Sequence, residues 1–138
     1  MAERIVTRPW VRPRKRVRDV AVVARYHAIR AGLLCEYCGR APGVELNHIL
    51  HGSKKEDQPF NFHLVCRPCH QDPVFGFHGH TPRWTVERAL RAKLAQGFAL
   101  PQVAWAYLEG WDQWPGTVQS IEEQFRLVEG LADQERRR

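Results

Sequence analysis

The sequence predicts a small α+β fold, and three observations lead to that prediction. Four cysteines form two C-x-x-C pairs, at positions 35 and 38 and at positions 66 and 69. A short strand pattern, from Val44 to Leu50, lies between the pairs. Apolar residues at helical spacing precede the first pair and recur after the second. With 138 residues, the chain is long enough for one domain with a modest core and a small appendage.

The segment before the first cysteine pair should form one amphipathic helix, from about residue 17 to residue 34. Its apolar stripe consists of Val20, Val23, Tyr26, Ile29 and Leu33. Residues 52–59, which follow the strand, are polar and charged and should form a surface loop. We expect a short helix to begin near Asn61, to carry Cys66 and Cys69 one turn apart, and to stop before Pro73.

Residues 81–138 contain three helical patterns and form the predicted C-terminal helical region. The first helix opens at Thr81 or Thr85 and runs to about Gln96, and the second covers residues 102–110. The third follows a Ser120-x-x-Glu123 capping box. Trp105, Trp111 and Trp114 are more typical of helical packing than of base stacking. The remaining chain divides into a basic arm, residues 1–16, and a core with its leading helix, residues 17–80.

The net charge of +6 is concentrated near the N-terminus, where seven Arg and Lys residues lie between Arg4 and Arg18 without an acidic residue. Such an arm binds phosphate backbones by releasing counterions, so we expect nucleic acid as the partner. A solubilising tail or a targeting signal is the alternative. The candidate contacts are Arg12, Arg14, Lys15 and Arg16 in the arm and Lys54 and Lys55 in the polar loop.

The sequence also indicates an intracellular location and a metal site. No stretch approaches the roughly 20 apolar residues that span a bilayer, and the basic N-terminus lacks the apolar core of a secretory signal, so we expect a cytoplasmic protein without a membrane. Reducing conditions there favour metal binding over disulfides. Cys35, Cys38, Cys66 and Cys69 can therefore close one tetrahedral structural zinc site. Buried thiols or a redox pair are the alternatives.

The segment between the two C-x-x-C pairs, which we call the first and second cysteine hooks, offers a second set of polar residues. Successive side chains of a strand alternate, so Asn47 and His48 should point to opposite sides, while His70 directly follows a cysteine. Asn47 offers a carbonyl oxygen and His70 a ring nitrogen, which together could bind a divalent cation with open positions for water and phosphate.

These residues resemble the HNH endonucleases of the ββα-metal type, particularly members braced by a four-cysteine zinc. Residues 35–70 carry the resemblance: Glu45-Leu46-Asn47-His48-Ile49 is similar to the first motif strand, Asn61 to the middle asparagine, and His70 to the final metal-binding position. The resemblance implies a ββα-metal core in a bacterial or phage-type protein. It implies that His48 is the general base, that Asn61 fixes the loop or orients the imidazole, and that Asn47 and His70 bind the catalytic cation.

The implied activity is hydrolysis of DNA phosphodiesters, in which neutral His48 takes a proton from the attacking water. Many family members carry aspartate where this chain has Asn47, which leaves Mg²⁺, Mn²⁺ or another divalent transition metal as the cation. Cleavage of both strands would need a homodimer or a larger complex. One alternative is a non-catalytic zinc-stabilised nucleic-acid-binding module, in which His48 is structural and Asn61 only caps a helix. Another is a structural module in which zinc organises a protein-binding surface.

Four further histidines, at positions 51, 63, 78 and 80, could be extra metal ligands or phosphate contacts. Each one taken alone is more typical of a surface or packing residue, because histidine is often satisfied by ordinary hydrogen bonds.

Overall fold

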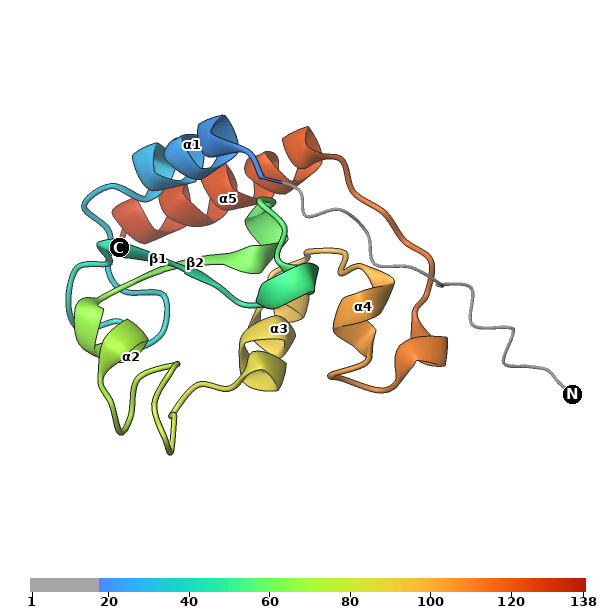
Figure 1. Cartoon of the computed structure of the whole chain (residues 1–138). Helices are drawn as coiled ribbons and strands as arrows, with labels where there is room; N and C mark the ends of the chain where they lie inside the picture. The colour runs from blue at the N-terminus through green and yellow to red at the C-terminus, as the bar shows by residue number, and fades with distance from the viewer. Residues whose placement is uncertain (1–17) are drawn as a thin grey trace, which may run out of the picture.

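The computed structural model describes residues 18–138, and it confirms a small α+β fold in that range. Figure 1 shows two short strands at the centre, with helices on both sides. The elements are α1 (Val20–Arg30), β1 (Glu45–His48), β2 (Phe62–Val65), α2 (Arg67–Gln71), α3 (Val86–Ala95), α4 (Gln102–Trp105) and α5 (Ile121–Arg136). The basic arm, including Arg12, Arg14, Lys15 and Arg16, lies outside the described residues.

The strands β1 and β2 form an antiparallel pair in which Glu45 lies opposite Val65 and His48 lies opposite Phe62. The strand predicted between residues 44 and 50 is therefore confirmed in slightly shorter form. The helix predicted from Asn61 was wrong in its first half, because residues 62–65 form β2 and the helix begins only at Arg67. All four residues of β2 are buried, so β2 lacks the alternation of polar and apolar residues that marks a half-exposed strand.

Helices α1 and α5 lie side by side along one side of the strand pair, and α2 lies on the other side (Figure 1). Asp19 caps α1 by accepting hydrogen bonds from the backbone N–H groups of Ala21 and Val22. The predicted capping box of α5 is confirmed, since Ser120 and Glu123 bond reciprocally. An exposed ion pair at 2.6 Å, between Arg25 and Glu122, joins the two helices.

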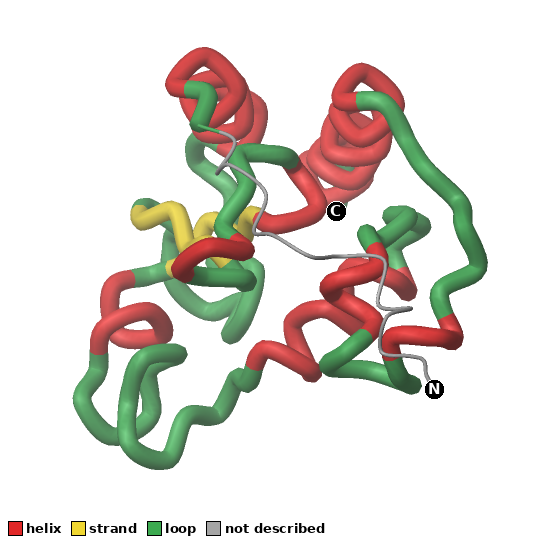
Figure 2. Tube along the Cα trace, turned by 45° about the vertical axis from the view of Figure 1, so that its right-hand side comes forward, coloured by secondary structure: helices red, strands yellow, loops and turns green. Residues whose placement is uncertain are grey.

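The hydrophobic core fills the space between the strand pair and the helices. Its fully buried side chains include Tyr26, Ile49, Phe60, Phe62, Leu90, Phe98 and Phe125. These residues come from α1, from the strand region, from α3 and the segment after it, and from α5, so the C-terminal helices pack into the same core as the cysteine-bearing segment. The tube in Figure 2 shows α3 and α4 following the long loop that leaves α2.

The C-terminal helices match their predictions in position but not always in length. Helix α3 starts after Thr85, whose hydroxyl accepts from Arg88 N, and ends before Gly97 at φ 102°. Helix α4 was predicted to reach residue 110 but ends at Trp105, after which turns lead to Gly110 at φ 125°. No helix in residues 18–138 is both long and apolar enough to cross a bilayer.

The polar loop between β1 and β2 is not entirely at the surface, contrary to the prediction for residues 52–59. Glu56 and Asp57 are only 6% and 8% exposed. Polar groups are buried without a large penalty when they have hydrogen-bond partners, and the loop supplies such partners. The loop therefore carries charged side chains inward, towards the end of β1.

Candidate functional site

The four cysteine sulfurs gather at one point beside the strand pair. Cys35 and Cys38 come from the loop after α1, Cys66 precedes α2 and Cys69 lies within α2. The four Sγ atoms lie within 4.8 Å of one another, and those of Cys38 and Cys66 are 3.8 Å apart. Sulfurs bound tetrahedrally to zinc at about 2.3 Å stand about 3.8 Å apart. The group can therefore hold a zinc ion.

Backbone N–H groups point at the sulfurs of the first hook. Tyr37 N and Cys38 N donate to Cys35 Sγ at 3.3 and 3.4 Å, and Arg40 N donates to Cys38 Sγ at 3.4 Å. Burial opposes the Cys38 thiolate, but the Arg40 N–H and the neighbouring sulfurs lower the pKa of Cys38 to about 7. Burial and then the neighbouring sulfurs raise the pKa of Cys69. Because four crowded thiolates repel one another, a bound cation is what allows all four to ionise together.

His48, the last residue of β1, is paired with a carboxylate. Its Nε2 atom lies 2.8 Å from Oδ1 of Asp57, and the two side chains are 17% and 12% exposed. The other carboxylate oxygen of Asp57 accepts the backbone N–H of Asp19 at 2.7 Å. Burial opposes ionisation of Asp57, but the Asp19 N–H and then His48 keep the pKa of that carboxyl below its usual value. Asp57 is therefore a carboxylate at neutral pH and can orient the imidazole.

Asn61 is fully buried and joins the two ends of the polar loop. Its Oδ1 accepts from Leu50 N at 2.7 Å, and its Nδ2 donates to Leu50 O at 3.2 Å and to Glu56 O at 3.1 Å. The side chain therefore fixes the loop, which is one of the two roles expected for it. No helix cap is formed by this side chain in the described structure, because Asn61 ends the 3-10 turn Pro59–Asn61 and β2 follows.

Asn47 lies in the interior, with no exposed surface. Its Nδ2 donates to the hydroxyl of Tyr37, and its Oδ1 is buried without a hydrogen-bond partner among the described residues. Asn47 and His48 have different surroundings, as the alternation of a strand predicts. The described contacts do not connect Asn47 with His70, so shared binding of a cation by these two residues stays a prediction.

His70, in α2, is held by a carboxylate from β1. Its Nδ1 atom lies 3.0 Å from Oε1 of Glu45. Glu45 also accepts from Arg67 Nε at 3.0 Å and from Gln71 Nε2 at 2.9 Å, so it anchors α2 to the strand. A carboxylate that accepts Nδ1–H leaves the lone pair of the imidazole on Nε2, and metal-binding histidines are usually oriented by such a partner.

One further histidine, His78, lies next to His70, and another, His51, lies next to His78. The loop after α2 folds back on the helix, where Phe77 N donates to Cys69 O at 2.7 Å and His78 N donates to His70 O at 3.4 Å. The ring centre of His78 lies 5.0 Å from that of His70 and 4.9 Å from that of His51. The ring of His78 therefore contacts the rings of both His70 and His51.

The other predicted residues have separate positions. His63 is buried, and burial holds its pKa well below the usual value, so it is a neutral packing residue against Tyr37. His80 is exposed. Lys54 donates to the Tyr107 hydroxyl at 2.8 Å and lies 4.9 Å from that ring centre, and Lys55 follows it in the same loop. DNA contact by either lysine stays a prediction.

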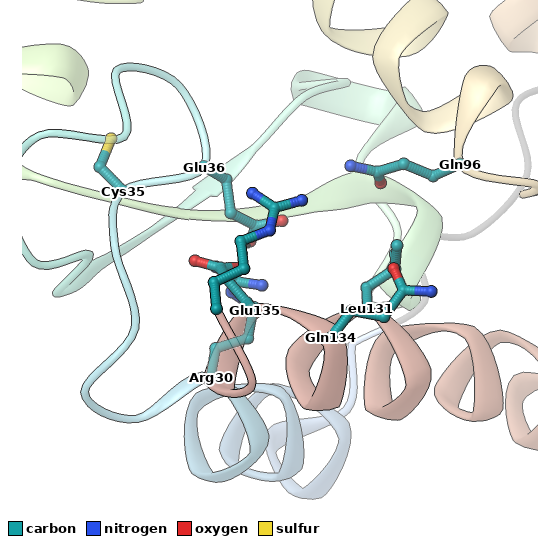
Figure 3. Close-up of a pocket in the computed structure, with 8 residues that line it drawn as sticks. Arg30, Cys35, Glu36, Gln96, Leu131, Gln134 and Glu135 are labelled. Carbon is teal, nitrogen blue, oxygen red and sulfur yellow. Dashed lines mark ion pairs between the residues drawn. The ribbon is translucent and has the colours of Figure 1, made fainter.

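A pocket of about 230 Å³ lies between the first cysteine hook and α5, and Figure 3 shows its side chains. Arg30 is one of the residues that line it, and its guanidinium lies 3.4 Å from Glu36 and 3.0 Å from Glu135. The lining residues are Arg30, Cys35, Glu36, Gln96, Leu131, Gln134, Glu135 and Arg138. None of these residues is His48, Asp57 or His70, so the pocket is separate from the histidines.

Sequence reasoning missed Asp57 as the partner of His48 and Glu45 as the partner of His70. Asp57 was treated as an ordinary charge of a surface loop. Glu45 was noted only as part of a strand motif, although its position two residues before Asn47 places it near the end of β1 that faces α2. A carboxylate within reach of each candidate histidine was the signal that could have identified both residues.

Comparisons with protein-family models, with curated proteins and with solved structures gave no match for this chain.

Proposed function

We propose that this chain is a divalent-metal-dependent endonuclease of the HNH type, which hydrolyses phosphodiester bonds in DNA with His48 as the general base. The observation that supports this most directly is the contact of 2.8 Å between His48 Nε2 and Asp57 Oδ1. A histidine that acts as a base needs a defined tautomer and a group that stabilises its protonated form. A part-buried carboxylate at one ring nitrogen supplies both.

Asp57 accepts the Nε2–H of His48, and the lone pair then lies on Nδ1. This nitrogen would take the proton from water as the water attacks phosphorus. The negative charge of Asp57 favours the imidazolium that results, since opposite charges at hydrogen-bond distance stabilise each other. Asn61 supports this arrangement indirectly, because it ties Leu50 to Glu56 and so limits the movement of the loop that carries Asp57.

The proposed reaction also requires a cation, which would stabilise negative charge on the phosphoryl and leaving oxygens. His70 and Asn47 are the residues that would hold it. Two observations fit this role: Glu45 directs the lone pair of His70 to Nε2, and the Oδ1 atom of Asn47 is a buried acceptor that lacks a hydrogen-bond donor. The order of β1, β2 and α2, braced by four cysteines, supports the likeness to the ββα-metal core.

DNA is the proposed substrate because the basic residues 4–18 would release counterions from phosphates. The charge of this arm lies outside the catalytic chemistry and would provide affinity without base recognition.

A plasmid relaxation assay tests the proposed function. Zinc-loaded protein is incubated with supercoiled DNA in Mg²⁺, in Mn²⁺ and in chelator, beside His48→Ala and the control His80→Ala. We expect metal-dependent nicking by the parent and by His80→Ala, and a loss of at least 10²-fold in His48→Ala. If His48→Ala cuts as well as the parent, the assigned base is wrong. If no cation supports cutting while DNA is still bound, the chain is a non-catalytic binding module.

A further inference from the structure

We propose that Phe75, Arg83 and Arg88 form a surface that binds an unpaired strand of DNA. We call these three residues, from the loop between α2 and α3 and from the start of α3, the loop surface. The two guanidinium groups would bind backbone phosphates, and the phenylalanine ring would stack on an unpaired base. The inference rests on the proposed function, because it names the form of DNA that the nuclease takes, but binding here can be measured without cleavage.

Phe75 presents its ring to solvent, unlike the other phenylalanines of the chain. It is 51% exposed, whereas the other five are at most 8% exposed. Cζ of Arg83 lies 5.2 Å from the centre of the Phe75 ring, and half of the residue stays exposed beside this contact. Val74, next in the chain, is 45% exposed. The ring therefore has apolar surface that a stacked base would cover.

The backbone of the loop is held in a defined conformation. Oδ1 of Asp72 accepts from Phe75 N at 2.9 Å, and Arg83 N donates to Phe75 O at 3.1 Å. A Cβ atom on Gly76 would lie 2.5 Å from Asp72 N, so only glycine fits at this close approach. The exposed ring is thus fixed on both sides of its residue, which reduces the entropy that a ligand would have to remove on binding.

Arg83 and Arg88 are positioned by aromatic rings and by the backbone. Cζ of Arg88 lies 4.5 Å from the ring centre of Trp84, and its Nη1 donates to Arg83 O at 2.8 Å. Neither guanidinium forms an ion pair with a carboxylate of residues 18–138, and Arg83 acts on Asp72 only at longer range. Arg91, one turn further along α3, is paired with two glutamates. The two exposed charges of the loop surface are therefore oriented and available to phosphate, which guanidinium groups bind well.

The loop surface adjoins the residues proposed to hold the catalytic cation. The loop folds back on α2, where His78 N donates to His70 O at 3.4 Å. On its other side, the Trp84 ring stacks on Tyr37 with ring centres 4.6 Å apart, and the Tyr37 hydroxyl accepts from Asn47. A strand bound at the loop surface would therefore pass next to α2 and the end of β1.

The aromatic ring decides between paired and unpaired DNA. Guanidinium groups bind the phosphates of either form, but a base inside a duplex is already stacked on both faces, so a single exposed ring gains a stacking partner only from an unpaired base. Such stacking tolerates any base, because every base has an aromatic face. The loop surface should therefore prefer gapped or single-stranded DNA without selecting a sequence.

Fluorescence anisotropy tests the surface with zinc-loaded protein, without added Mg²⁺ or Mn²⁺, on a duplex and on a gapped duplex of the same length. We expect the parent to bind the gapped DNA tighter by about fivefold or more, which is the contribution of one stacked base. Phe75→Leu should lose this preference, and the control Phe75→Tyr, which keeps an aromatic face, should retain it.

The salt dependence of binding to a single strand tests the two arginines separately. An Arg83→Gln and Arg88→Gln double variant should reduce the slope of log K against log salt by about 1.4, since each phosphate contact on a single strand contributes about 0.7. Arg126→Gln, at an exposed position of α5 on the opposite side of the strand pair, is the control and should leave the slope unchanged (Figure 1).

The loop surface is wrong if the parent binds gapped and paired DNA equally, or if Phe75→Leu keeps the preference. An unchanged salt slope in the double variant would remove the arginines from it. If the double variant loses zinc or its helical circular dichroism signal, the comparison of Phe75→Leu with Phe75→Tyr decides. A preference that depends on Phe75 in a protein that cuts no DNA would contradict the nuclease proposal alone. Cutting by a protein whose variants bind as the parent does would contradict the loop surface alone.

Discussion

The Nε2 atom of His48 lies 2.8 Å from the Oδ1 atom of Asp57, a residue in the loop that follows the strand. The same carboxylate accepts the backbone N–H of Asp19, the N-cap residue of α1. One side chain therefore connects the end of β1 with the start of the first helix. The imidazole of His48 is oriented by a carboxylate that is itself fixed in place.

Asp57→Asn should reduce DNA cleavage about 10²-fold with little change in DNA binding, because the amide keeps the shape of the side chain but loses the charge that stabilises an imidazolium. The acidic limb of the pH–rate profile should move to lower pH, which a purely structural role would not cause. Single-turnover cleavage between pH 5 and 9 measures both effects. Asp133→Asn, on the exposed surface of α5, is the control, and equal rates in the two variants would contradict the role of Asp57.

Asn61→Ala should lower the free energy of unfolding by about 3 kcal/mol, because the buried N–H of Leu50 and two buried carbonyls would lose their partner. Urea denaturation measures the change. Cleavage should also fall, since the loop that carries Asp57 would be released. A variant with parental stability would show that water replaces these hydrogen bonds and that Asn61 does not fix the loop.

The features predicted correctly from sequence depend on local signals. Helix α3 was located from a start at Thr81 or Thr85, of which Thr85 is the cap, and from Gly97, and α5 was located from the reciprocal pair Ser120 and Glu123, because each cap involves residues three positions apart. The cysteine group was predicted for a similar reason. Two equal C-x-x-C hooks can close one tetrahedral metal site, whatever the fold of the residues between them.

The features that were missed depend on contacts between distant segments. All four residues of strand β2 are buried, with contacts from Tyr26 of α1 and from the first cysteine hook, so its sequence, Phe62 to Val65, carries no period of two and could not be distinguished from a short helix. Asp57 belongs to a charged segment that ordinarily lies in solvent. Its burial follows from its contacts with His48 and with the start of α1, which no local pattern reveals.

Cys35→Ser and Cys69→Ser should each abolish tight zinc binding and unfold most of the chain at 25 °C. The free energy of zinc binding in small domains is about 10 kcal/mol or more at neutral pH, which is comparable with the whole stability of a domain of this size. Elemental analysis should find about one zinc per parent chain, and circular dichroism should follow the folding of each variant. Fully folded protein without zinc would contradict the structural role of the metal.

Lys93 should make stability depend on pH in the alkaline range, because it is 1% exposed and burial lowers its pKa from 10.5 to about 8. Between these values the unfolded chain holds a proton that the folded chain has released, so folding becomes more favourable as the pH rises from 8 to 10.5. The full gain is about 3 kcal/mol. At neutral pH both states are protonated, and the folded state carries the cost of a buried ammonium.

Chemical denaturation of the parent and of Lys93→Met across this range measures the effect. The difference in unfolding free energy between the two should shift in favour of the parent as the pH rises, since methionine fills a similar volume without a titrating group. Lys54→Met, at an exposed position, should show no such trend. A constant difference between the parent and Lys93→Met from pH 7 to 10.5 would show that the Lys93 amine titrates normally, through its contact with the Tyr26 hydroxyl at 3.2 Å.

Deletion of residues 1–16 should weaken DNA binding and flatten its dependence on salt, because the segment carries six of the Arg and Lys residues. Each phosphate contact contributes about 0.9 to the slope of log K against log salt, so complete engagement of the arm would reduce the slope by about 5. Fluorescence anisotropy with duplex DNA at several salt concentrations measures the slope.

A Lys54→Ala and Lys55→Ala double variant should change the slope by about 2 at most, since only two charges are removed. If the deletion leaves the slope unchanged while the double variant lowers it, the phosphates contact the loop between the strands, and the arm has no part in binding.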